Sequence, residues 1–142
     1  MKTITKILIT MLILFLAIGI VAATNIDNFK VPDGYNNLKD GCAAYATNGD
    51  RMLYVEKVLG DYKTDWFTNT SDMTVSDVGN NTYYYEDTAL GIYGYQEIVV
   101  FDGENYMVSV NQNSKLSPSE KTAYLKDIQE FNKLNNLEPI AV

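Results

Sequence analysis

The sequence predicts an α+β fold: an antiparallel β-sheet of about five to seven strands with one C-terminal α-helix packed across a face, preceded by an N-terminal apolar signal or anchor helix. Three observations lead to this prediction. An uncharged apolar run follows two lysines at the N-terminus, strand-like segments separated by turn residues fill the middle of the chain, and an amphipathic helical pattern closes it.

The N-terminal run has the layout of an export signal. Lys2 and Lys6 precede about 17 residues without a charge, and Val21-Ala22-Ala23 supplies the small residues that a signal peptidase requires. As a helix this run spans roughly 25 Å, a little short of the ~30 Å hydrocarbon core of a bilayer. We therefore expect residues 1–23 to be a cleaved signal peptide, with an uncleaved membrane anchor as the alternative. In both cases the rest of the chain is extracytoplasmic, either secreted or anchored to the cytoplasmic membrane.

The remainder of the chain is long enough for one domain and is strongly acidic. Residues 24–28 are predicted to be a short linker and residues 29–142 a single domain. Removing residues 1–23 takes away two of the 11 basic residues and none of the 18 acidic ones, which leaves a net charge of −9. A surface of this sign repels phosphate backbones, so we expect no nucleic-acid partner. Cys42 is the single cysteine; we interpret it as a small buried hydrophobe, and a reactive or intermolecular thiol is the alternative.

Strand patterns begin directly after the linker. Phe29–Tyr35 is predicted to be an edge strand that ends in a Pro-Asp-Gly turn. Cys42–Ala46 and Met52–Val58 flank Asn48-Gly49-Asp50. Because an Asn-Gly pair adopts positive φ at little cost, this arrangement predicts a β-hairpin.

The middle of the chain predicts further strands. Trp66–Thr68 and Met73–Val75 are expected to be short strands separated by polar residues, and Tyr83–Tyr85 is expected to pair with Ile92–Tyr95. Each of these segments is rich in aromatic or β-branched residues, which are typical of strands.

A hairpin and a helix end the predicted fold. Tyr95–Phe101 and Asn105–Val110 flank the turn Asp102-Gly103-Glu104, which predicts a hairpin. One face of this hairpin is richer in apolar residues than the other. Ser117-Pro118-Ser119-Glu120 is a capping box with proline at the first helical position, and it predicts where the helix begins. The apolar stripe of this helix is expected to consist of Tyr124, Leu125, Ile128, Phe131 and Leu134.

Side chains that support catalysis are scarce. The sequence has no histidine, which excludes Ser-His-Asp and Cys-His catalysis and histidine-containing zinc sites within this chain. Glu86 and Asp87 are adjacent on a predicted strand and therefore point to opposite faces, so we interpret them as turn residues rather than a sugar-hydrolysing dyad. Asp102–Asn105 offers oxygen ligands for Ca²⁺, but its spacing is not that of an EF-hand, and a hairpin turn explains it. We assign no catalytic, metal-binding or cofactor-binding residue.

The tyrosine-rich stretch is the most distinctive feature of the sequence. By the two-residue period of a strand, Tyr83 lies on the same face as Tyr85, and Tyr93 on the same face as Tyr95. Exposed, these rings together with Trp66 would form an amphipathic platform suited to stacking on sugars or binding a peptide. The alternative is that they are cross-strand aromatic pairs that stabilise the sheet and form its core.

Two sequons for N-glycosylation fall in predicted loops. Asn69-Thr70-Ser71 and Asn80-Asn81-Thr82 match the acceptor pattern, so Asn69 and Asn80 are candidate glycosylation sites in an exported protein. They are consistent with an extracytoplasmic location and indicate no activity.

The export signal, Phe29–Tyr35, the strand pattern Tyr106–Val110 and the closing segment Glu130–Ile140 together resemble small exported proteins of unknown function from methanogenic archaea. The resemblance covers most of the chain after the signal. It implies an anaerobic setting, which suits the single cysteine, and glycosylated surface proteins, which suits the sequons. It supplies no catalytic or binding residues.

The sequence therefore favours a non-catalytic, extracytoplasmic binding module without a cofactor. We expect it to engage an envelope protein or glycan through the aromatic patch, and to contact the membrane through its N-terminal segment if that segment is not cleaved. Two alternatives are a small carboxylate-dependent hydrolase of envelope polymers and a structural subunit of the envelope.

Overall fold

The computed structural model describes residues 29–40, 43–60 and 66–142. The predicted signal or anchor segment and the linker after it lie outside these residues, as does Cys42. Within the described ranges, no helix combines the length and the apolar character needed to cross a bilayer.

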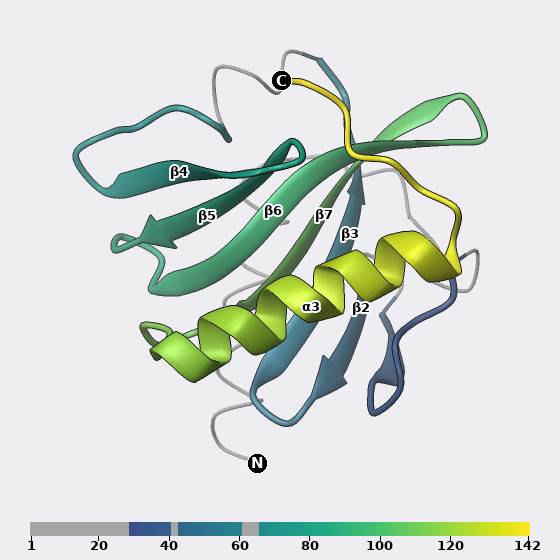
Figure 1. The fold of residues 1–142 in the computed structure, drawn as a ribbon, viewed down its shortest axis with the longest axis horizontal. Helices are drawn as coiled ribbons and strands as arrows, with labels where there is room; N and C mark the ends of the chain where they lie inside the picture. The colour runs from purple at the N-terminus through teal and green to yellow at the C-terminus, as the bar shows by residue number, and fades with distance from the viewer. Residues whose placement is uncertain (1–28, 41–42, 61–65) are drawn as a thin grey trace.

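The described residues form one antiparallel sheet of seven strands followed by one helix, α3 (Figure 1). The strand order β1-β2-β3-β7-β6-β5-β4 joins two meanders, β1 to β3 and β4 to β7, through the pairing of β3 with β7. The elements are β1 (Asn36–Asp40), β2 (Ala43–Asn48), β3 (Arg51–Lys57), β4 (Met73–Gly79), β5 (Thr82–Asp87), β6 (Ile92–Phe101), β7 (Glu104–Gln112) and α3 (Pro118–Leu134). The predicted antiparallel sheet with a C-terminal helix across one face is confirmed.

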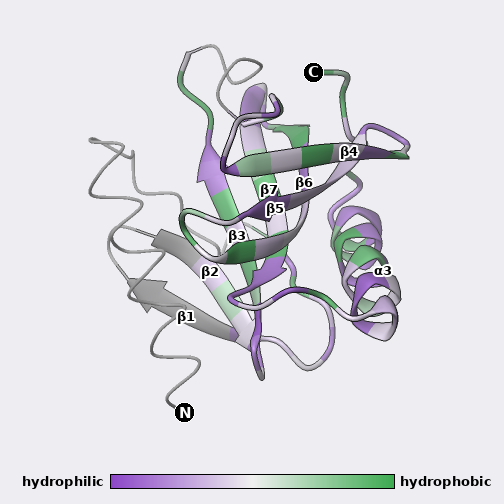
Figure 2. Cartoon of the chain, turned by 90° about the vertical axis from the view of Figure 1, so that its left-hand side faces the viewer, coloured by the Kyte–Doolittle hydropathy of each residue, from purple (hydrophilic) through white to green (hydrophobic). Residues whose placement is uncertain are grey.

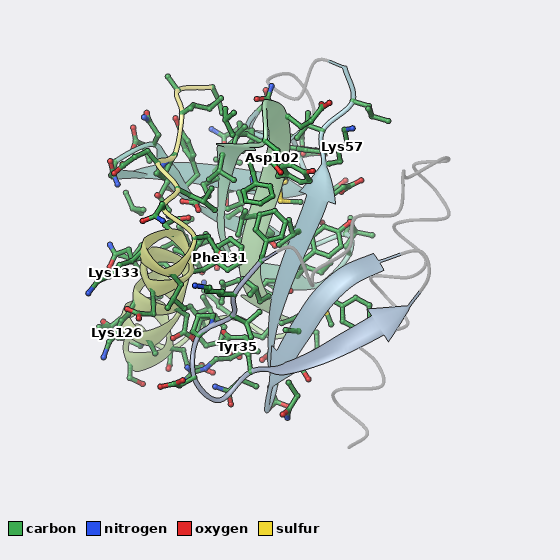
Figure 3. The ribbon with its side chains drawn as sticks, turned by 90° about the vertical axis from the view of Figure 1, so that its right-hand side faces the viewer. Tyr35, Lys57, Asp102, Lys126, Phe131 and Lys133 are labelled. Atoms are coloured by element: carbon green, nitrogen blue, oxygen red, sulfur yellow. The ribbon has the colours of Figure 1, made fainter. Side chains whose placement is uncertain are left out.

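Helix α3 begins and packs as its sequence predicts. The Ser117 hydroxyl accepts the Glu120 N–H, and the Glu120 carboxylate accepts the Ser117 N–H, so both halves of the capping box form. The side chains of Tyr124, Ile128 and Phe131 are buried against the sheet. Figure 3 shows Phe131 directed toward the strands, while Lys126 and Lys133 project away from them.

The central strands β3, β6 and β7 carry buried residues on both faces of the sheet (Figure 2 shows α3 beside one of them). We call the face under α3 the helix face, and its strand residues include Leu53, Val55, Tyr95, Val99, Val108 and Val110. We call the opposite face the far face, and its strand residues include Met52, Tyr54, Tyr85, Ile92, Ile98 and Met107. Partly buried residues outside the sheet, Trp66, Phe67, Ile140 and Val142, pack against the far-face cluster.

The predicted hairpins are confirmed. Strands β2 and β3 pair with Asn48 opposite Arg51, and β6 and β7 pair with Phe101 opposite Glu104. The two strands predicted around Tyr95 are one continuous strand, β6, which pairs first with β5 and then projects beyond it. The part beyond β5 is bordered by the C-terminal segment, where the Ile140 N–H donates to the Ile98 carbonyl at 2.8 Å.

The edge strand predicted at Phe29–Tyr35 is wrong, although its turn is present. The backbone N–H and carbonyl of Lys30 bond to the side-chain amide of Asn135, at 2.7 and 2.8 Å, instead of to a strand. Phe29 packs among Phe101, Tyr106 and Phe131 as part of the core under α3. The alternating apolar residues thus serve as core packing between the sheet and the end of the helix, and the first strand among the described residues is β1.

The strand predicted at Trp66–Thr68 is also wrong, because these residues form a turn before β4. Met73–Val75 is confirmed as the start of β4. The outward N–H groups of β4 at Met73 and Val75 are bonded by the side chains of Thr70 and Asn69, so the loop before the strand covers part of this sheet edge.

Candidate functional site

The predicted tyrosine patch is divided between the two faces of the sheet. Strands β5 and β6 pair with Tyr85 opposite Gly94, so neighbouring side chains alternate in step across the pair. Tyr93 and Tyr95 belong to the helix-face core or pack against it, whereas Tyr85 belongs to the far-face core. A single platform made of all these rings is therefore wrong.

Tyr85 and Tyr95 are core residues, with exposed fractions of 7 and 4%. The Tyr85 hydroxyl reaches Ser109 on β7 at 2.9 Å, across the position of Gly94, which has no side chain to block it. Tyr95 lies opposite Tyr84 with ring centroids 5.4 Å apart. The alternative drawn from the sequence, that the tyrosines stabilise the sheet from its core, is confirmed for these two residues.

The rest of the patch forms a smaller aromatic cluster on the far face. We define this cluster as Trp66, Phe67 and Tyr83, each of which is half-buried. The rings of Phe67 and Tyr83 meet edge to face, with centroids 5.1 Å apart and planes at 69°. The side chain of Gln96, which lies opposite Tyr83 on β6, donates to the Trp66 carbonyl and fixes this loop over the strands.

Sequence reasoning missed Phe67. In a strand at Trp66–Thr68, neighbouring side chains would point to opposite faces, so a strand would not bring Phe67 and Trp66 together. In the turn that these residues form, both side chains pack on the same far-face cluster. The pair of adjacent large aromatic residues before a polar loop was the signal that could have identified it.

A carboxylate borders the aromatic cluster. Asp77 on β4 lies directly opposite Tyr83 on β5, and Asp77 is exposed. Burial, with the nearby Asp77 charge, raises the pKa of the Tyr83 hydroxyl above its ordinary value. At neutral pH this edge therefore offers a phenol that donates, a carboxylate that accepts, and aromatic rings with apolar surfaces.

The tyrosines on the helix face have partners within the protein. The Tyr84 hydroxyl donates to Glu86 at 2.9 Å, and the Lys121 ammonium lies 4.6 Å from the Tyr84 ring centroid. Glu86 also lies 3.8 Å from the Lys115 ammonium. Tyr93 is half-buried at the margin of the helix-face core, so it provides a matched comparison for Tyr83 on the opposite face.

The two neighbouring carboxylates are separated, as predicted. Glu86 faces Tyr84 and Lys115, whereas Asp87 accepts the Leu90 N–H at 2.9 Å within the turn that comes after β5. They do not form a dyad. Within the described ranges, no group of three or more His, Cys, Asp or Glu side chains could hold a metal ion.

Both candidate glycosylation sites are exposed and lie at opposite ends of β4. Asn69 accepts the Val75 N–H through its side-chain oxygen at 2.6 Å, which leaves the amide nitrogen free of that bond. Asn80 adopts a positive φ of 52° in the turn between β4 and β5. Glycosylation at these residues stays a prediction, and the geometry is compatible with it.

Comparisons with protein-family models, with curated proteins and with solved structures find no match for this chain.

Proposed function

We propose that this protein is an exported, non-catalytic binding module that recognises a glycan of the cell envelope through the far-face aromatic cluster of Trp66, Phe67 and Tyr83. The observation that carries the proposal is the edge-to-face pair of Phe67 and Tyr83 beside Trp66, with the Asp77 carboxylate at its border. Sugars present flat C–H surfaces and a rim of hydroxyls, and this cluster offers complementary rings and polar groups.

The cluster is supported from below, which lowers the entropic cost of binding. Phe67 and Trp66 pack on the far-face core, and the Gln96 amide holds the backbone of the loop. Rings that are held by packing lose little conformational freedom when a ligand contacts them, so more of the contact energy appears as affinity. Aromatic side chains with a polar group are also the residues that dominate many binding sites.

Charge supports a neutral or hydroxyl-rich ligand. The full chain has a net charge of −7, and Asp77 is exposed at the cluster itself. Anionic polymers would be repelled at this surface, whereas a carboxylate accepts hydrogen bonds from sugar hydroxyls.

The test measures binding of the full chain to glycans released from envelope extract, by titration calorimetry. Tyr83→Ala and Trp66→Ala are each expected to weaken binding tenfold or more, since each removes one stacking surface. Tyr93→Ala is the matched control, because it truncates a half-buried tyrosine on the helix face, and it should leave affinity within a factor of two.

Equal losses for Tyr83→Ala and Tyr93→Ala would contradict the assignment of the binding surface. Binding that survives removal of the glycans but is abolished by protease treatment of the extract would show that the ligand is a protein. Fractionation of the intact chain as a freely soluble cytosolic protein would overturn the export on which the proposed location rests.

A further inference from the structure

Glu97 is a fully buried carboxyl at the junction of three elements. It lies on β6 on the helix face, and its side chain has no exposure to solvent. Its Oε2 accepts from the Asn132 amide nitrogen at 3.0 Å and from the Thr82 hydroxyl at 3.4 Å. The carboxyl thereby connects β6 both to the start of β5 and to the last turn of α3.

Two oxygen atoms at this junction lack a hydrogen-bond donor. Glu97 Oε1 and Asn132 Oδ1 are both buried and have no hydrogen-bond partner. When Glu97 is ionised, both atoms can only accept, so they cannot bond to each other. Such groups are costly in a protein interior, where nearly all buried polar atoms are satisfied. A proton on Glu97 Oε1 changes the count, because a protonated carboxyl gains an O–H donor.

The geometry suits a paired acid and amide. The bond from the Asn132 nitrogen to Glu97 Oε2 already holds the two planar groups together at one of their two atom pairs. A second bond, from the protonated Oε1 to Asn132 Oδ1, closes a ring of two hydrogen bonds. One proton then satisfies both unpartnered oxygens.

We propose that Glu97 and Asn132 form a neutral acid–amide pair that fastens the end of α3 and the C-terminal segment to the sheet, and that loss of its proton in alkaline conditions releases them. Asn132 is the attachment point for that segment, because its backbone carbonyl accepts the Leu137 N–H at 2.9 Å. Ile140 then bonds to Ile98 on β6.

The surroundings of Glu97 favour the protonated form. Burial is the main cause that raises the pKa of this carboxyl, to about 8, and the nearby Glu138 charge raises it further, while the bonds from Asn132 and Thr82 lower it. Thr82 on β5 and Asn132 on α3 are uncharged, and Val108 lies opposite Glu97 on β7. Among the described residues, the charge that acts on Glu97 is therefore that of Glu138, and it has the same sign as the carboxylate.

The experiment measures amide hydrogen exchange of the full chain between pH 6 and pH 9.5, corrected for intrinsic exchange. Protection at Leu137 and Ile140 is expected to fall tenfold or more across this range, while the Val108 amide in β7 serves as the reference. Glu97→Gln keeps an amide in place of the acid and cannot ionise, so protection at Leu137 and Ile140 should then be independent of pH.

Glu56→Gln is the matched control, because Glu56 is a buried carboxyl on the far face whose hydroxyl donor, Tyr54, lies on the same strand rather than on α3. It should leave the pH dependence at Leu137 and Ile140 as in the unmodified chain. Carbon-13 resonances of the Glu97 carboxyl provide a second measurement that needs no variant. Titration of that carboxyl below pH 6, or protection at Leu137 and Ile140 that does not change with pH, would overturn the proposal.

Discussion

The two faces of the sheet both carry a cluster of buried residues, but they differ in what their polar groups contact. On the helix face, Val99, Val108 and Val110 pack beneath Phe131 and Ile128, and the buried polar groups Glu97 and Gln112 bond to Asn132 and Tyr124 of the helix. The far face mixes apolar and polar buried residues, namely Met52, Tyr54, Glu56, Tyr85, Gln96, Ile98, Met107, Ser109 and Asn111. The same strands therefore build one side whose buried polar groups also bond to the helix, and another whose buried polar groups bond mainly within the sheet.

The polar groups of the far face bond mainly to one another along and across the strands. The Tyr54 hydroxyl donates to Glu56 two residues further along β3, at 2.9 Å. Ser109 is bonded both by Tyr85 from β5 and by Asn111 from the same strand. The proposed binding cluster lies on the far face, where aromatic and polar groups are combined, whereas α3 covers the other face.

The largest expected effect tests the role of packing on the helix face. Phe131→Ala removes a ring with no exposure to solvent from between α3, Phe29 and the sheet, and should lower the free energy of unfolding by about 4 kcal/mol. Chemical denaturation measures this change. Val100→Ala on the far face is the control, since its side chain is 45% exposed, and it should cost less than about 0.5 kcal/mol. A similar loss from both variants would mean that packing under the helix is not the dominant contribution.

The sequence predicted those parts of the fold that are encoded by local signals. The capping box at Ser117 located the start of α3, and turn residues around Gly49 and Gly103 located two hairpins, because these preferences act within a few residues. Phe29–Tyr35 was misassigned because its backbone partner is the side chain of Asn135, 105 residues away from Lys30. No local pattern carries that information.

The candidate site was only partly predictable for the same reason. Period-two alternation correctly placed Tyr83 with Tyr85, and Tyr93 with Tyr95, but it does not say that the two pairs lie on opposite faces of the sheet, or which face a helix will cover. Burial of Tyr85 depends on its reach across Gly94 to Ser109, and this depends in turn on the register of three strands. Glu97 was missed because nothing local distinguishes a buried carboxyl from a solvated one.

The buried carboxyls of the two faces should differ in their effect on stability. The folded-state pKa of Glu97, about 8, is above its ordinary value of 4.5, so between these values the folded chain binds more protons than the unfolded chain. The contribution of Glu97 to the free energy of unfolding is therefore greatest below pH 4.5. It falls as the pH rises toward 8, by roughly 3 kcal/mol between pH 5 and pH 8. Urea denaturation across this range measures the slope, and Glu97→Gln should remove it.

Glu56→Gln should flatten the pH dependence of stability much less. Burial raises the pKa of Glu56, but the hydroxyl of Tyr54 donates to its carboxylate and favours the ionised form. If Glu56→Gln flattens the dependence of the unfolding free energy on pH as much as Glu97→Gln does, the two buried carboxyls contribute equally. That result would contradict a distinct role for the Glu97–Asn132 pair.

The smallest of the three effects tests how the far face achieves its close pairing. A Cβ atom at Gly94 would lie 2.1 Å from the Val110 carbonyl oxygen of β7, a contact with backbone that no side-chain rotation relieves. Gly94→Ala should therefore force β6 away from β7 and cost about 2 kcal/mol, as measured by denaturation. It should also disturb the bond between Tyr85 and Ser109 that crosses this position, which a changed near-ultraviolet circular dichroism signal would report.

Gly103→Ala is the comparison, because a Cβ there meets no atom within 4 Å and only the positive φ of 75° opposes it. If Gly94→Ala costs no more than Gly103→Ala, the absence of a side chain at Gly94 is not what allows the far-face residues of β5 and β7 to bond across β6.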